Sequence, residues 1–185
     1  MLSTRLNALL GIDYPVLNAP MSGTATADLA AAVSQAGGFG MLGGTSAGGA
    51  DWLREQIHAV RAMTDRPFGV GFISSFPGVD DLVQVALDER VAAINHSFAD
   101  PTPYVEPAHA RGVRIFAQVQ TVAQATRAAQ AGVDVVIAQG TEAGGHTGQA
   151  GSLALLPAVV DAVGDIPVVA AGGIGDGRGF AAGLL

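Results

Sequence analysis

The fold of this chain is decided by residues 135–148, VVIAQGTEAGGHTG, where an apolar run passes directly into a glycine-rich loop. The run is apolar on both faces, as expected of a strand buried in a parallel sheet. The loop carries one carboxylate, Glu142, and one imidazole, His146, among its glycines. Glycine lets the backbone approach a ligand closely, and histidine holds or releases a proton near neutral pH. We therefore expect a buried strand that opens into a functional loop.

Similar apolar runs recur along the whole chain, with helical stretches between them. Strands and helices that alternate at about 25 residues per unit predict βαβ units with right-handed crossovers. The expected helices include Asp28–Ala36, Asp51–Met63, Asp80–Glu89, Thr121–Ala131 and Leu153–Val163. The expected strands are Pro15–Pro20, Phe39–Gly44, Pro67–Ile73, Ala92–Phe98, Arg114–Val119, Val133–Gly140 and Pro167–Gly173.

Polar residues gather at the carboxyl ends of most of these expected strands. The periodicity alone allows a (β/α)₈ barrel or a doubly wound open sheet. The carboxyl ends converge on one face of a barrel, whereas an open sheet spreads them along an edge. We therefore predict an α/β fold, a TIM (β/α)₈ barrel truncated after about seven βα units, with residues 1–185 as a single domain.

Composition excludes several classes of protein. The 185 residues are 49% hydrophobic and 14% charged, without cysteine, so no disulfide framework, thiolate nucleophile or cysteine-based zinc site is expected. A formal charge of −7 argues against nucleic-acid binding. No apolar run is long enough for a membrane span, and the first residues lack the features of a signal peptide. We expect a cytoplasmic enzyme that binds neither nucleic acid nor membrane and needs no metal.

Two further motifs point to a cofactor. The run at Pro167–Gly173 ends in Gly172-Gly173, and a glycine turn after the seventh strand of a barrel commonly forms half of a phosphate cradle. The turn Ala19-Pro20-Met21 offers a polarisable methionine, which suits the face of a flat aromatic cofactor.

Taken together, these motifs resemble the nitronate monooxygenase family, formerly called the 2-nitropropane dioxygenases. The resemblance covers the whole chain, and the segment 142–146, EAGGH, is its most specific part. The other matching segments are 13–15 with 19–21, 36–40, 139–148 and 170–174.

The resemblance implies an FMN-dependent (β/α)₈ barrel enzyme that oxidises alkyl nitronates with O₂ to a carbonyl compound and nitrite. The family's catalytic histidine falls on His146. In one respect the chain departs from the family, because Gly71 stands where many members carry an asparagine that contacts the flavin. The implied flavin contacts are Ala19, Pro20, Met21, Gln118, Gln139 and Gly144, with Gly172 and Gly173 at the phosphate.

Two alternatives remain open. The FMN-dependent enoyl-ACP reductases share the barrel and a similar loop, but they tend to carry Gln-Gly-Gly-Met where this chain has Asn18-Ala19-Pro20-Met21. The chain also ends within the expected seventh helix, before the eighth strand and C-terminal helices of the family. An inactive fragment is therefore the other alternative, and its unpaired strand edges favour homo-oligomers.

The remaining polar residues have weaker assignments. His96, at the end of the fourth expected strand, is a minor candidate for contact with the substrate, while Glu142 is expected to support its loop or to be solvated. His58 and His109 are expected at the surface, Asp176 at a helix N-terminus, and Arg178 in solvent rather than at a phosphate.

Overall fold

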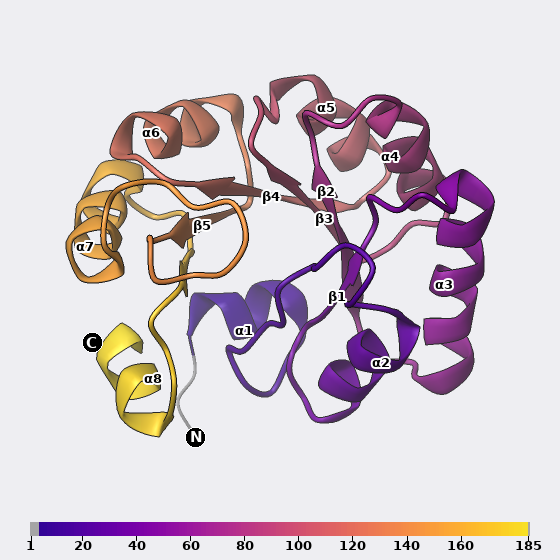
Figure 1. Ribbon diagram of the computed structural model, residues 1–185, viewed down its shortest axis with the longest axis horizontal. Coiled ribbons are helices and arrows are strands. Elements are labelled where there is room, and N and C mark those ends of the chain that lie inside the picture. Colours follow the sequence, from indigo (N-terminus) through magenta and orange to yellow (C-terminus); the bar gives the residue numbers. More distant parts are fainter. Residues whose placement is uncertain (1–3, 185) are drawn as a thin grey trace. The chain divides into compact units, whose positions relative to one another are not determined.

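The computed structural model describes residues 4–184, in which helices and strands alternate (Figure 1). The strands are β1 (Gly40–Gly43), β2 (Phe68–Ile73), β3 (Ala93–Ser97), β4 (Arg114–Val119), β5 (Val135–Gln139) and β6 (Val168–Ala171). The helices are α1 (Arg5–Leu10), α2 (Ala27–Gln35), α3 (Gly49–Met63), α4 (Val79–Asp88), α5 (Thr102–Ala110), α6 (Val122–Ala131), α7 (Ser152–Val163) and α8 (Gly177–Leu184).

The chain divides into two compact units, Met1–Ile115 and Phe116–Leu185. In the first unit, β1, β2 and β3 are parallel, with Gly40 opposite Phe68 and Gly71 opposite Asn95. Helix α2 contacts β1, and α3 lies between α2 and α4. The core between these strands and helices contains fully buried apolar side chains, among them Phe39, Phe72, Leu53 and Ile57.

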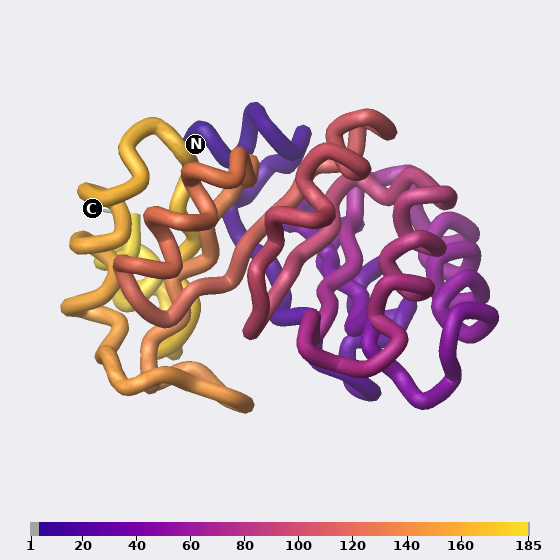
Figure 2. Tube along the Cα trace, turned by 90° about the horizontal axis from the view of Figure 1, so that it is seen from above, coloured from indigo at the N-terminus to yellow at the C-terminus, as the bar shows by residue number. Residues whose placement is uncertain are grey.

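The second unit repeats the same plan. The end of β4 is parallel to β5, with Phe116 opposite Val135, and β5 is parallel to β6. Helices α6 and α7 lie side by side, and α7 also contacts β5 and β6 (Figure 2). Helix α6 begins as predicted, because the side chain of Thr121 accepts a hydrogen bond from the backbone N–H of Gln124. It ends at Gly132, whose φ of 93° breaks the helix.

The prediction of a first strand over Pro15–Pro20 was wrong in extent. Only one parallel bridge forms there, between Leu17 and Phe39. Proline has no N–H for a strand ladder, and one stands at each end of this segment. The side chain of Asn18 instead binds the backbone of Met41. Of the seven expected strands, the described residues therefore form six.

Helix α1 was not predicted, because its six residues are too few to show a helical period. Its ends nevertheless follow the usual rules for helix caps. The side chain of Asn7 accepts a hydrogen bond from the N–H of Thr4 at 2.9 Å, and Gly11 closes the helix with a φ of 67°.

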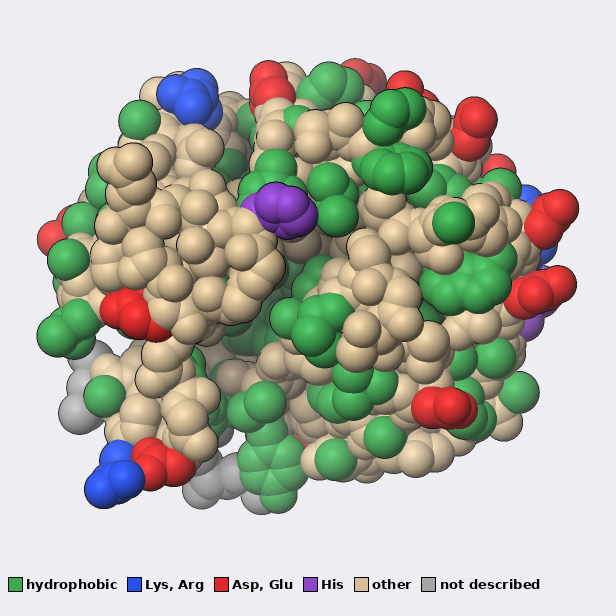
Figure 3. All heavy atoms as spheres, in the orientation of Figure 1, with side chains coloured by type: hydrophobic (Ala, Val, Ile, Leu, Met, Phe, Trp, Pro, Cys, Tyr) green, Lys and Arg blue, Asp and Glu red, His purple; other side chains and the backbone are tan. Residues whose placement is uncertain are grey.

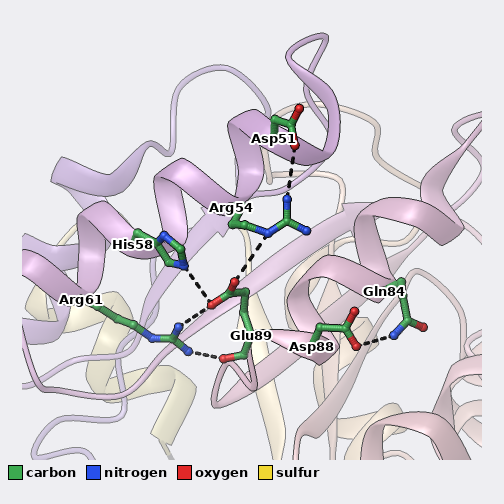
Figure 4. A network of polar contacts seen from close by, with 7 residues as sticks. All are labelled: Asp51, Arg54, His58, Arg61, Gln84, Asp88 and Glu89. Carbon is green, nitrogen blue, oxygen red and sulfur yellow. Dashed lines mark hydrogen bonds and ion pairs between the residues drawn. The ribbon is translucent and has the colours of Figure 1, made fainter.

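Glu89 directly follows the last residue of α4, and its carboxylate joins this end of α4 to α3 (Figure 4). This carboxylate accepts from Arg61 at 2.7 Å and lies 3.1 Å from His58 Nε2, and both partners belong to α3. Arg54, one turn earlier, approaches the other carboxylate oxygen at 3.7 Å. The Glu89 side chain is only 18% exposed, so solvent weakens its ion pairs less than it weakens a fully solvated pair.

The surface matches the acidic composition. Acidic side chains are spread over the face drawn in Figure 3, and basic ones are few there. Within residues 4–184, no helix has the length and apolar character that a membrane span requires. That residues 1–185 form a single domain remains a prediction.

At Gly40, helix α2 lies directly against β1. A Cβ added there would overlap the backbone carbonyl oxygen of Ala30 in α2. We expect Gly40→Ala to lower the free energy of unfolding by about 3 kcal/mol, since backbone on both sides of the contact must move. Urea denaturation would measure this change.

Gly112→Ala is the matched control. Its φ of 71° also disfavours a side chain, but an added Cβ meets nothing within 4 Å. We expect it to cost about 1 kcal/mol. Equal losses in the two variants would show that the overlap with Ala30 is unimportant.

Candidate active site

The turn Ala19-Pro20-Met21 is attached to β1 by the side chain of Asn18. Its Oδ1 accepts a hydrogen bond from the N–H of Met41 at 2.8 Å, and its Nδ2 donates to the carbonyl of Met41 at 2.9 Å. The carboxamide thus takes the place that a strand's backbone would occupy beside Met41. Asn18 is a positioning residue for this turn, a role that the sequence alone does not reveal.

Two glycines let the same turn lie directly on the strands. A Cβ on Gly43 of β1 would overlap the carbonyl of Met21, and one on Gly71 of β2 would overlap the ring of Pro20. The second contact explains the departure noted at Gly71, because Pro20 fills the space that a side chain would need. The turn remains accessible, since Met21 is 43% exposed.

In the second unit, the loop that carries His146 is held at the end of β5 by Gln120. The Nε2 atom of Gln120 donates at 2.8 Å both to Oε1 of Gln139 and to the carbonyl of His146. Gln139 is buried, whereas the side chain of His146 is exposed. Gln120 was not predicted as a site residue. The signal available in the sequence was the polar run Gln118-Val119-Gln120 at the end of β4.

The other end of the loop is held by Glu142. Its Oε2 accepts from the N–H of Ser152 at 2.8 Å and from the Ser152 hydroxyl at 2.9 Å, at the first turn of α7. These hydrogen bonds, the backbone one first, lower the pKa of Glu142. The prediction that Glu142 supports its loop is confirmed.

The glycines at the end of β6 lie against this loop. Gly172 and Gly173 have φ values of 110° and 79°, which other residues rarely adopt. A Cβ on Gly172 would lie 2.6 Å from the backbone nitrogen of Ala143. The predicted phosphate turn and the loop with the predicted catalytic histidine are therefore neighbours.

The predicted site residues fall into two groups, one in each unit. Gln118 lies half-buried on β4 beside Ile137, two residues before Gln139 on β5. Gly144 lies in the open, with nothing within 4 Å of an added Cβ. The first group is Ala19, Pro20 and Met21, and the second is Gln118, Gln139, Gly144, His146, Gly172 and Gly173.

His96 is buried, whereas the expected contact with a substrate would require an accessible side chain. Its ring is 1% exposed and stacks on Tyr104 of α5, with the ring centroids 4.2 Å apart. The Ser74 hydroxyl lies 2.8 Å from its Nδ1. Burial lowers the pKa of His96 from 6.5 to about 4, against an opposite and smaller effect of the Asp80 carboxylate.

The remaining histidines, Asp176 and Arg178 lie where the sequence predicts them. His58 and His109 are exposed. Asp176 precedes α8 and accepts from the N–H of Arg178 at 2.9 Å, which suits its predicted place at a helix N-terminus. The Arg178 guanidinium is 93% exposed and binds the Asp176 carboxylate. Among residues 4–184, no group of three or more acidic, histidine or cysteine side chains is placed to hold a metal ion.

Comparison with known proteins places these features in a family. The family model for nitronate monooxygenase matches residues 3–82 and 73–185. Nitronate monooxygenase of Pseudomonas aeruginosa is 36% identical over 99% of this chain and 65% of its own length. A (3aS,4S,5R,7aS)-5-hydroxy-7a-methyl-1-oxo-octahydro-1H-indene-4-carboxyl-CoA dehydrogenase of Mycobacterium tuberculosis is 37% identical over 99% of this chain and 52% of its own length. The chain thus spans about half to two thirds of the length of these relatives.

Two solved structures show the same fold. FabK of Thermotoga maritima has a TM-score of 0.96 and 41% identity, over 100% of this chain and 58% of that one. Nitroalkane oxidase of Streptomyces ansochromogenes has a TM-score of 0.88 and 33% identity, over 98% of this chain and 64% of that one. The predicted α/β fold of the (β/α)₈-barrel class is confirmed.

The buried His96 makes stability depend on pH. Its pKa lies below that of an unfolded chain, so the unfolded state binds the proton more readily. The contribution of neutral His96 is complete above pH 6.5 and is lost as the pH falls from 6.5 to about 4. We expect a loss of about 3 kcal/mol across this window, measured by urea denaturation.

His96→Phe keeps an aromatic ring against Tyr104 and removes the titrating group. We expect this variant to lack the His96 component of the pH dependence. If both proteins lose the same stability between pH 6.5 and 4, a group other than His96 is responsible.

Proposed function

Since the chain belongs to the nitronate monooxygenase family, we propose that it is an FMN-dependent oxidoreductase that oxidises alkyl nitronates with O₂ to a carbonyl compound and nitrite. The observation that carries this proposal is the double anchoring of the loop with His146. Gln120 holds the backbone of His146, and Glu142 holds the loop on α7. An exposed imidazole on a loop fixed in this way is suited to orient a small anion. We further propose that residues 1–185 are one cofactor-binding domain of a cytoplasmic enzyme.

The described residues suit a flavin. The turn at Ala19–Met21 presents an exposed methionine to an aromatic ring. Gly173 and Gly144 are exposed, so their backbone is open to a phosphate or a ring oxygen. Gln118 and Gln139 add carboxamides that both donate and accept. When bound, the flavin would accept electrons from the substrate and deliver them to O₂.

His146 would act on the substrate in one of two ways. A nitronate carries its negative charge on two oxygens, and an imidazole N–H can donate to one of them and hold the anion. With a neutral nitroalkane, the imidazole would instead take the proton from the α-carbon as a general base. Both roles need the ring to keep one position, which the Gln120 contact supports.

A second candidate function is reduction of an enoyl thioester. It is favoured by the likeness to FabK and to a dehydrogenase of a CoA thioester. Such a reaction would use NAD(P)H as the reductant and the same flavin. The turn Asn18-Ala19-Pro20-Met21, without the two glycines common in that group, favours nitronate oxidation.

Purified protein supplied with FMN would test the proposal. We expect a yellow protein that consumes O₂ and releases nitrite with an alkyl nitronate. His146→Gln should retain the flavin absorbance and lose about 100-fold or more in kcat/KM. The control is His109→Gln, an exposed histidine on α5, which should retain activity.

The other outcomes separate the alternatives. Oxidation of NAD(P)H with an enoyl thioester, without nitrite release from nitronates, would support the reductase. A colourless protein that takes up no added FMN would contradict both enzyme assignments and support an inactive fragment.

A further inference from the structure

Asn95, in the middle of β3, has a buried polar atom without a partner. Its residue exposure is 0%, and its Nδ2 donates to the Ser97 hydroxyl at 3.1 Å. Its Oδ1 has no hydrogen-bond partner within residues 4–184. An unpaired buried carbonyl costs about 1–3 kcal/mol, and such groups are few in a folded protein. The unpaired Oδ1 is therefore a feature that needs an explanation.

The direction of the Asn95 side chain provides an explanation for the unpaired Oδ1. Successive side chains of a strand face opposite sides, so Asn95 and Ser97 share a face while His96 turns toward α5. Asn95 is opposite Gly71 on β2. The position of a Cβ on Gly71 lies 3.6 Å from Nδ2 of Asn95 and overlaps the ring of Pro20. The space that a side chain on Gly71 would fill thus lies between Nδ2 of Asn95 and Pro20 of the turn Ala19-Pro20-Met21.

We propose that Asn95 is a cofactor-binding residue whose Oδ1 accepts a hydrogen bond from the imide N–H of the flavin ring. This inference rests on the flavin site proposed above. The carboxamide has one free acceptor and a second amide hydrogen beyond the one given to Ser97. An imide presents the complementary pair, an N–H beside a C=O. Since Oδ1 is shielded from solvent, the ring must displace atoms that now cover it.

The proposal predicts different effects of one substitution on stability and on binding. Asn95→Leu has a similar volume and removes the unpaired oxygen together with the hydrogen bond to Ser97, so the flavin-free protein should be about as stable as the wild type. The same variant should bind FMN about tenfold more weakly, since one hydrogen bond to the ligand is lost. Urea denaturation without flavin and fluorescence titration with FMN measure the two quantities. If Asn95→Leu does not fold, Asn95→Ala serves in its place.

A modified ligand identifies the atom involved. FMN methylated at its imide nitrogen cannot donate there, so the wild type should bind it about tenfold more weakly than FMN. Asn95→Leu should bind FMN and methylated FMN with equal affinity. The effect of methylation would then depend on the Asn95 side chain, as expected if the two groups interact. The control is His96→Phe, a change on the other face of β3. This variant should bind FMN like the wild type and prefer it over methylated FMN to the same extent.

Each other outcome has a definite meaning. A wild type that binds no FMN overturns this inference together with the proposed cofactor. A wild type that binds FMN, with an unchanged affinity in Asn95→Leu or an equal effect of methylation in both proteins, overturns the role of Asn95 alone. A variant that loses stability and affinity together would show a structural role.

Discussion

Close packing against glycines, within the strands and directly after β5, is the constraint on which this structure depends. Gly40 lets helix α2 lie against β1, and Gly43 and Gly71 let the turn at Ala19–Met21 lie against β1 and β2. Gly140 does the same for the start of α7 at Ser152. Because a Cβ at any of these positions would overlap its neighbour, the strands determine where the surrounding segments lie.

The regular elements could be predicted because their signals are local. An apolar run between glycines predicts β5, and Thr121 and Gly132 predict the two ends of α6. The segment Pro15–Pro20 has a similar composition but does not form a strand. A segment joins a sheet only if its backbone forms hydrogen bonds with the neighbouring strand. Here the side chain of Asn18, not the backbone, binds Met41. Composition does not reveal that a side chain takes the place of the backbone.

The sequence predicts residue types for the candidate site, but it does not predict the contacts that hold them in place. The family motif indicates His146, yet the contact that holds its backbone comes from Gln120, which lies between β4 and α6. The polar run Asn95-His96-Ser97 places polar groups on both faces of β3, so its pattern does not show which face meets the helices. Only packing distinguishes Asn95, beside the turn, from His96, beneath Tyr104.

The anchoring of the loop 140–151 at both ends also affects the size of the smallest ligand that the loop would bind. A nitronate of few atoms has little contact area, and its total binding free energy is limited accordingly. A loop that had to be ordered on binding would cancel much of that free energy through lost conformational entropy. Because Gln120 and Glu142 hold the loop in place, the proposed nitronate would be bound without the large apolar surface that bigger substrates bury.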